Sequence, residues 1–377
     1  MLDFLNNYKE RIIVSKNKIK KCYVGEQLSN IPLIFNLSPF YLIKSNKVAI
    51  KKYFSNPYSA LEIQLKSISE HLEFIEDDYI PYLYPYWGVC ALASGFGGKV
   101  QFYENKDPWL DEKAIKDFKD IDKLKKPELG QAGLMKTVFN LMKIWKKEVK
   151  DGIPIGITDI QGPISISIDL MGVENFFLGV IDCPNKIHKL LDIVTEYLID
   201  CLKKSYSIIG DRNDGYFVTG IYIPAGYGKV RISEDNIIFI SPEICKEFLK
   251  PYIERIFSEI GNGSIHWCGD GFKNINEISK IEGLMGINNC SMGDIEIIKK
   301  QNEISTEKNL IYQNEVIMPK PEWFAKLKEV LIKKYLLHHF IISSDNFGIS
   351  FNGYELMDLD RIEYIKNILR ISHASLK

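Results

Sequence analysis

The sequence predicts an α/β fold of the (β/α)8 barrel type. Three observations favour it. The chain has 377 residues, 46% of them hydrophobic, which is enough to bury a large core. At least seven strand candidates alternate with helical stretches, and no linker-like composition separates them. The main competitor is an open doubly wound sheet, but its GxGxxG turn is absent: Gly95-Phe-Gly-Gly98 has neither that spacing nor a long strand before it.

We expect a single domain over residues 1–377, with residues 1–70 as a helical extension packed on the barrel. This extension is interrupted by a short strand at 31–36 and by a helix that starts at Asn56-Pro57. A strand is predicted at 72–81, ending in Asp77 and Asp78. An aromatic, glycine-dotted stretch follows at 82–98, and then a helix at 128–150.

The alternation continues to the end of the chain. A strand at 152–159, a long helix at 165–207 and a strand at 214–222 lead to a loop at 224–236. Ser241-Pro242 is a typical helix start, so a helix is predicted over 242–260. Strands follow at 264–268, 284–289, 310–316 and 339–344, with helices at 273–282, 293–303, 321–336 and 358–370.

Charge and composition exclude several function classes. Lys and Arg total 48 against 49 Asp and Glu, and no basic stripe is interleaved with aromatics, so nucleic acid is not an expected partner. Lysines at 143–150 and 299–300 are typical of solvated helix faces. No signal peptide and no run of about 18 apolar residues is present, so we expect a soluble, cytoplasmic protein without membrane contact. The seven cysteines form no CxxC pair and are expected to be free thiols.

One strand candidate carries two metal-ligand side chains. In Ser264–Gly271, His266 and Cys268 are two positions apart, so on a strand they share a face while Trp267 points away. An imidazole and a thiolate that converge at a strand end can bind zinc. Two ligands do not complete a site, and a pairing of two core residues is the alternative.

In a barrel, the loops that follow the strands collect polar side chains on one face. On this basis Asp78, Asp159, Gln161 and Tyr222 are candidate catalytic residues. Tyr227, Asp235, Gln313 and Asn346 are candidates for binding a small-molecule substrate. Cys290 follows the strand next to that of His266 and Cys268 and is a further candidate metal ligand. For each residue the alternative is an ordinary loop side chain that caps a helix.

Several segments resemble the uroporphyrinogen decarboxylase superfamily. They are Pro154–Pro163, Leu170–Asn175, Asp182–Asp192, Ser241–Pro251 and Ile265–Gly269. The resemblance extends over roughly residues 30–370 and implies a TIM barrel, for which a homodimer is a common assembly. The decarboxylase itself holds its acidic substrate with an arginine-bearing N-terminal segment. The corresponding region here, about 35–46, has no arginine, and Lys44 offers only a point charge.

The His-x-Cys pattern resembles the cobalamin-dependent methyltransferases of the superfamily, such as the methylcobamide:coenzyme M type. That resemblance implies zinc held by His266, Cys268 and a second cysteine on the final strand, with a corrinoid protein as methyl donor. Here Asn346, or a neighbour, stands where that second cysteine would be. Cys290 is a candidate replacement, and Asp345 or Glu234 are alternative oxygen ligands. A site with only His266 and Cys268 is a further alternative, in which no metal binds and the pair makes hydrogen bonds to a substrate.

Three functions therefore stay open. The leading one is a methyltransferase-like enzyme that moves a methyl group between a corrinoid protein and a thiol or similar acceptor at zinc. The second is a metal-free decarboxylase of a small acid or a tetrapyrrole-related compound, in which Asp77 or Asp78 stabilises developing positive charge. The third is a catalytically inactive homologue that serves as a binding partner.

Overall fold

The computed structural model describes residues 2–26, 28, 32–36, 53–54, 56–103, 107–290, 294–308, 310–317, 338–343 and 370. Its central feature is a six-stranded sheet in the order β1-β10-β9-β8-β7-β6. All five pairings are parallel. The strands are β1 (Leu33–Asn36), β6 (Val230–Ser233), β7 (Gly263–Cys268), β8 (Leu284–Cys290), β9 (Ile311–Ile317) and β10 (His338–Ser343). The α/β class and the parallel order are thus confirmed.

Isolated parallel bridges extend this order beyond β6. Gln161 pairs with Ser233, Ile157 with Val218 and Ile155 with Leu83. Among the described residues no pairing joins the segment at Leu83 to β1, so the ring of strands is not closed there by backbone hydrogen bonds. Next to Leu83, the backbone N–H and C=O of Tyr84 are bonded to a side chain, the carboxamide of Gln64. Its oxygen lies 2.8 Å from Tyr84 N and its nitrogen 2.6 Å from Tyr84 O.

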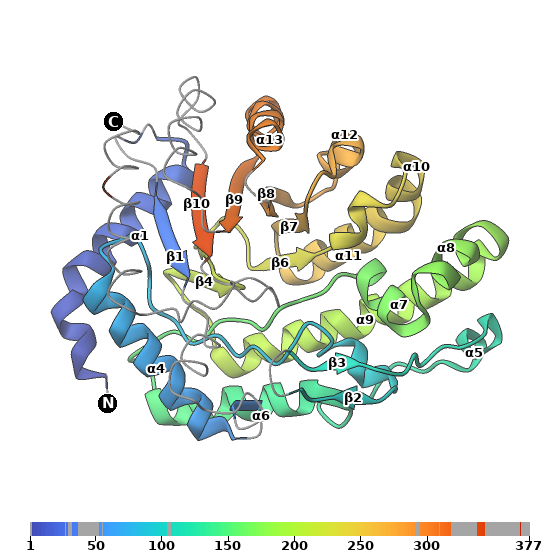
Figure 1. Ribbon diagram of the computed structural model, residues 1–377, viewed down its shortest axis with the longest axis horizontal. Coiled ribbons are helices and arrows are strands. Elements are labelled where there is room, and N and C mark those ends of the chain that lie inside the picture. The colour runs from blue at the N-terminus through green and yellow to red at the C-terminus, as the bar shows by residue number, and fades with distance from the viewer. Residues whose placement is uncertain are drawn as a thin grey trace.

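Helices surround the strands (Figure 1). The α-helices are α1 (Lys9–Tyr23), α4 (Pro57–Phe74), α5 (Phe118–Lys123), α6 (Gly133–Val149), α7 (Pro163–Met171), α8 (Val173–Asp182), α9 (Pro184–Ile209), α10 (Pro242–Ile244), α11 (Lys250–Ile260), α12 (Ile275–Ile278) and α13 (Ile295–Lys308). Short 3-10 turns are η1 (Asp3–Tyr8), η2 (Ala93–Phe96), η3 (Asp235–Ile238) and η5 (Phe272–Asn274), and η4 (Cys245–Leu249) is a π-helical turn.

Two small antiparallel pairs lie beside the main sheet. One joins β2 (Val100–Gln101) to β3 (Trp109–Leu110), and the other joins β4 (Gly215–Val218) to β5 (Ile221–Pro224). The strand predicted at 214–222 is therefore a hairpin. Its turn residues Thr219 and Gly220 both have positive φ, 39° and 81°, as the tight turns of two-residue hairpins require.

Three further element predictions are wrong in detail. No strand forms at 72–81, because α4 continues to Phe74 and the chain then runs irregularly toward Leu83. The segment 152–159 makes only single bridges. The long helix predicted at 165–207 is three helices, since Gly172 (φ 91°) ends α7 and Pro184 starts α9. The helices predicted at 321–336 and 358–370 fall outside the described residues, residue 370 aside.

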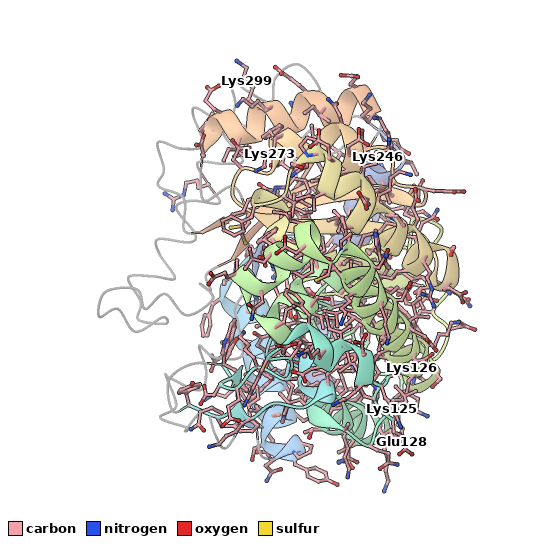
Figure 2. The ribbon with its side chains drawn as sticks, turned by 90° about the vertical axis from the view of Figure 1, so that its right-hand side faces the viewer. Lys125, Lys126, Glu128, Lys246, Lys273 and Lys299 are labelled. Carbon is pink, nitrogen blue, oxygen red and sulfur yellow. The ribbon has the colours of Figure 1, made fainter. Side chains whose placement is uncertain are left out.

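The core is built mainly from isoleucine and aromatic side chains, and Trp87, Trp145 and Trp267 are fully buried. Charged side chains lie on the outer helices. Figure 2 shows Lys125, Lys126, Lys246, Lys273 and Lys299 spread over one side of the molecule. Within the described residues no single helix has the length and apolarity to cross a membrane; only α7 and α8 taken together, bent by 109°, pass that test.

Candidate metal centre

The end of β7 delivers the two predicted ligands to one place. Ile265 and Trp267 are fully buried on the other face of the strand, and alternation leaves His266 and Cys268 on the opposite face. His266 is 2% exposed, and its Nε2 lies 3.5 Å from the Cys268 sulfur. The convergence predicted for this pair is what the structure shows.

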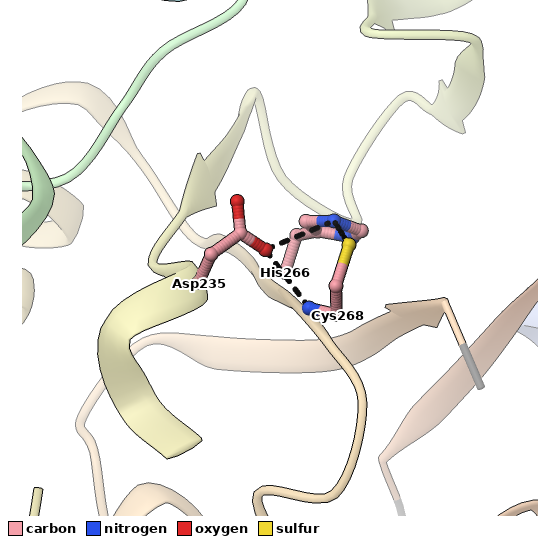
Figure 3. Close-up of side chains that lie close together, drawn as sticks. All are labelled: Asp235, His266 and Cys268. Carbon is pink, nitrogen blue, oxygen red and sulfur yellow. Dashed lines mark hydrogen bonds and ion pairs between the residues drawn. The ribbon is translucent and has the colours of Figure 1, made fainter. Parts of the chain in front are cut away.

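The third ligand-type side chain is Asp235, the first residue of η3 (Figure 3). Its Oδ1 lies 3.7 Å from His266 Nε2 and accepts a 2.8 Å hydrogen bond from the Cys268 backbone N–H. Among the described residues, Asp235, His266 and Cys268 form a group whose ligand atoms all lie within 4.8 Å of one another. Asp235 reaches this position because β6 pairs with β7 and places Ser233 beside His266.

These separations suit a tetrahedral zinc ion. Zinc–sulfur bonds of about 2.3 Å and zinc–nitrogen bonds of about 2.0–2.1 Å at a tetrahedral angle place the two ligand atoms about 3.6 Å apart. The observed sulfur-to-nitrogen distance is 3.5 Å. Thiolate, imidazole and carboxylate are the three ligand types that zinc takes in proteins, so the residues present fit the metal.

The second ring nitrogen of His266, Nδ1, faces away from Cys268 and Asp235 and is bonded to Asn288 on β8. Nδ1 lies 2.6 Å from Asn288 Oδ1, an amide oxygen that also accepts a 2.7 Å bond from Arg231 Nε. Burial, followed by the positive charge of Arg231, holds the pKa of His266 well below its usual value. The imidazole is therefore neutral and keeps a lone pair for a metal.

A buried polar network continues from Asn288 to the segment at 159–161. Arg231 is 1% exposed, and its Nη1 lies 2.7 Å from Ser233 Oγ and 3.4 Å from Asp159 Oδ1. The other Asp159 oxygen accepts a 2.6 Å bond from Gln161 Nε2. The network balances a buried guanidinium with a buried carboxylate, as buried charges require.

Glu234, next to Asp235, fastens this segment to α7. Its carboxylate accepts bonds of 3.0 Å from the backbone N–H groups of Ile164 and Ser165 and one of 2.8 Å from Ser165 Oγ. A carboxylate at a helix N-terminus satisfies amides that have no partner inside the helix. A Cβ on Gly162 would lie 2.2 Å from the Glu234 oxygen, so glycine is needed there.

The structure brings Asp159, Gln161 and Asp235 to the site. Cys290 pairs in register with Cys268 on β8, yet within the described residues the group is completed by Asp235. From the sequence, Asp235 is a candidate for binding substrate, and the structure places it beside His266 and Cys268. The backbone of Gln313 lies in register with Asn288. Asn346 and Asp345 fall outside the described residues.

Two other predicted site residues, Tyr227 and Tyr222, are not brought to this group. Tyr227 lines a small cavity with Ser264, Gly286 and Ile311, which lie at the starts of their strands. Tyr222 donates its hydroxyl to the backbone oxygen of Asp214, just before β4. These contacts lie at the opposite end of the parallel strands from Cys268.

Asp78 is likewise held elsewhere. Its carboxylate lies 2.6 Å from Lys18 Nζ on α1, the helix whose Lys16 binds Asp214. No strand forms at 72–81, so Asp78 does not follow a strand but precedes the bridge residue Leu83. Its catalytic role stays a prediction that these contacts do not support.

Arg231 is a further site residue that is not among the candidates predicted from the sequence. The signal was present in Val230-Arg-Ile-Ser233, where a charged residue alternates with β-branched residues on a strand. On a fully buried strand, an arginine facing the interior needs buried partners and marks a polar centre.

Comparison with known proteins adds two findings. The family model described as uroporphyrinogen decarboxylase (URO-D) matches residues 15–207. A solved structure of a methyltransferase from Methanosarcina mazei is similar at a TM-score of 0.67 and 16% sequence identity, covering 96% of this chain and 98% of the other. At that identity the likeness shows a shared fold. No curated protein matches the sequence significantly.

Proposed function

We propose that this chain, which belongs to the uroporphyrinogen decarboxylase (URO-D) family, is a methyltransferase that acts at a zinc ion. The methyl group would move between a corrinoid protein and a thiol or similar acceptor. The observation that carries the proposal is the convergence of Asp235, His266 and Cys268 on one point at the end of β7. The end-to-end likeness to a methyltransferase fold supports it.

Asp235, His266 and Cys268 would hold the zinc ion, and the acceptor would bind beside them. Zinc supplies one chemical effect when bound: it stabilises an acceptor thiol as the thiolate near neutral pH. The chain contributes the rest. His266 stays neutral and directs one nitrogen at the site, while Asp235 and Cys268 supply the two negative charges that offset a divalent cation.

The buried network gives the site its polar wall. Asp159 and Gln161 bind each other and connect to Arg231, so their positions are fixed before a substrate arrives. Preorganised donors and acceptors of this kind orient a substrate at little entropic cost. We propose that Asp159 and Gln161 contact the substrate from this wall, with Gln313 and Asn346 as further candidate contacts.

A methyl-transfer assay tests the proposal. Purified protein is mixed with methylcob(III)alamin and a panel of small thiols, and loss of the methyl–cobalt absorbance is followed. We expect transfer that stops when dipicolinate removes the metal and returns with zinc. His266→Ala with Cys268→Ala should abolish transfer, whereas Cys183→Ala, a change at a partly exposed thiol before α9, should not. Transfer that continues undiminished in the double variant would contradict the proposal.

The second candidate is a metal-free decarboxylase, favoured by the family model itself, which carries that activity in its description. A screen for CO2 release from small acids and tetrapyrrole-related compounds separates the two. Release that persists in dipicolinate would support the decarboxylase, and release that is abolished by chelation would exclude it.

A further inference from the structure

The amide of Asn288 lies between two hydrogen-bonding groups with different requirements. Arg231 Nε is 2.7 Å from Asn288 Oδ1, and His266 Nδ1 is 2.6 Å from the same oxygen. A guanidinium N–H can only donate, whereas a neutral imidazole nitrogen can donate or accept. The side of Asn288 that faces Arg231 must therefore be the carbonyl oxygen.

This orientation determines where the imidazole proton sits. Because Nδ1 faces an oxygen that cannot donate, Nδ1 must carry the proton and donate it. The second nitrogen, Nε2, is then left with its lone pair. Nε2 lies 3.5 Å from the Cys268 sulfur and 3.7 Å from Asp235 Oδ1, at the point where the three ligand atoms converge.

Arg231 is itself held firmly. It is 1% exposed, and Ser233 Oγ and Asp159 Oδ1 lie 2.7 Å and 3.4 Å from its Nη1. Strands β6, β7 and β8 are in parallel register here, with Ser233 beside His266 and His266 beside Asn288. The guanidinium therefore cannot swing away and allow the Asn288 amide to turn over without leaving a buried charge unpaired.

We infer that Arg231 is a positioning residue for the metal centre: acting through Asn288, it fixes His266 in the Nδ1–H tautomer and so keeps Nε2 free to bind metal. The inference rests on the proposed function for its consequence in metal binding. The tautomer itself is a property of the metal-free protein. Outer contacts to a metal-binding histidine typically change metal affinity by about 10–100-fold.

The test begins with metal-free protein labelled with 15N in its six histidines. Long-range 1H–15N NMR distinguishes the Nδ1–H from the Nε2–H tautomer, and a His266→Gln variant assigns the signal. We expect wild type to show only Nδ1–H for His266. Arg231→Met should introduce the Nε2–H form of His266. Arg231→Lys, which keeps a positive donor, should show Nδ1–H as wild type does. Asn288→Ala should also introduce the Nε2–H form.

The second readout is zinc affinity, measured by competition with a chromophoric chelator. Arg231→Met should weaken binding by about 10–100-fold and Arg231→Lys by much less. Ser264→Ala is the matched control, because Ser264 is buried and in register with Arg231 on β7, and it should change neither readout.

The outcomes separate this inference from the proposed function. A pure Nδ1–H signal in folded Arg231→Met would overturn the inference, whatever the metal result, and so would a pure Nδ1–H signal in Asn288→Ala. Should Arg231→Met not fold, Asn288→Ala with Arg231→Lys decides the same question. Failure of wild-type protein to bind zinc would contradict the proposed function, while the tautomer measurement would still stand for or against the inference.

Discussion

At the scale of single residues, the site is a His-Cys pair on β7 completed by a carboxylate at the start of η3, just after the neighbouring strand β6. His266 and Cys268 were predictable because the two-residue period of a strand alone puts them on one face. Asp235 was not predictable as a ligand, because its place depends on the pairing of β6 with β7 and on the turn into η3. Glu234, which sequence reasoning offered as an oxygen ligand, instead caps α7.

Replacing Asp235 should identify the third ligand. Asp235→Asn keeps an oxygen that can accept the Cys268 N–H but removes the negative charge, so we expect zinc affinity to fall by at least about 100-fold. Cys290→Ala should leave affinity nearly unchanged. Asp270→Asn, a change in an exposed carboxylate just after β7, is the control. A larger loss with Cys290→Ala than with Asp235→Asn would favour a thiolate ligand set.

At the scale of elements, α7 is the helix whose N-terminus binds Glu234, the residue next to Asp235. Glu234 caps its first turn, and nearly all of its side chains are buried. Asp169 near its end is mostly buried, and burial raises its pKa to about 6, an effect that Lys113 reduces. Such a carboxyl group favours its protonated form in the folded protein.

The raised pKa of Asp169 makes the stability of the protein depend on pH. The folded pKa lies above the usual 3.8, so Asp169 contributes stability below pH 3.8 that is lost as pH rises through about 6. Asp169→Asn removes this loss and should raise the free energy of unfolding at pH 7.5 by up to about 3 kcal/mol. Near pH 4 the variant and wild type should converge. Urea unfolding at both pH values measures the difference, and a gap that widens toward pH 4 would contradict the account.

At the scale of the whole molecule, partly buried ion pairs join the N-terminal helix α1 to the segment at 77–78. Arg11 binds the carboxylate of Asp77 at 2.9 Å and the Leu72 backbone oxygen at 3.0 Å. The Asp77 side chain is fully buried and also bonded to His71 at 3.0 Å. Asp77 and Asp78, the two acids predicted at a strand end, therefore bind side chains of α1.

Arg11→Ala should consequently destabilise the protein. Removal of one partner leaves a buried carboxylate with reduced compensation, and we expect a loss of about 2–4 kcal/mol in the free energy of unfolding. Lys20→Ala on the same helix, where the side chain is exposed, should change stability by less than about 0.5 kcal/mol. Equal losses in both variants would argue against the role given to Arg11.

The fold was largely predictable, because strands such as β7, β8 and β9 carry local patterns that sequence alone displays. Errors arose where local patterns conflict with long-range contacts. The apolar run before Asp77 extends a helix, and a β-branched segment at 214–222 turns back at Thr219 and Gly220. Arg231 was overlooked because its partners, Asp159 and Asn288, come from segments distant in the sequence.

The central claim is that zinc is bound by Asp235, His266 and Cys268. X-ray absorption at the zinc K edge of the purified protein tests it most directly, because sulfur and nitrogen or oxygen neighbours differ in distance by about 0.2–0.3 Å. The account predicts about one zinc per chain with one sulfur neighbour and the remainder nitrogen or oxygen. A first shell with two or more sulfurs, or protein that binds no zinc, would contradict it.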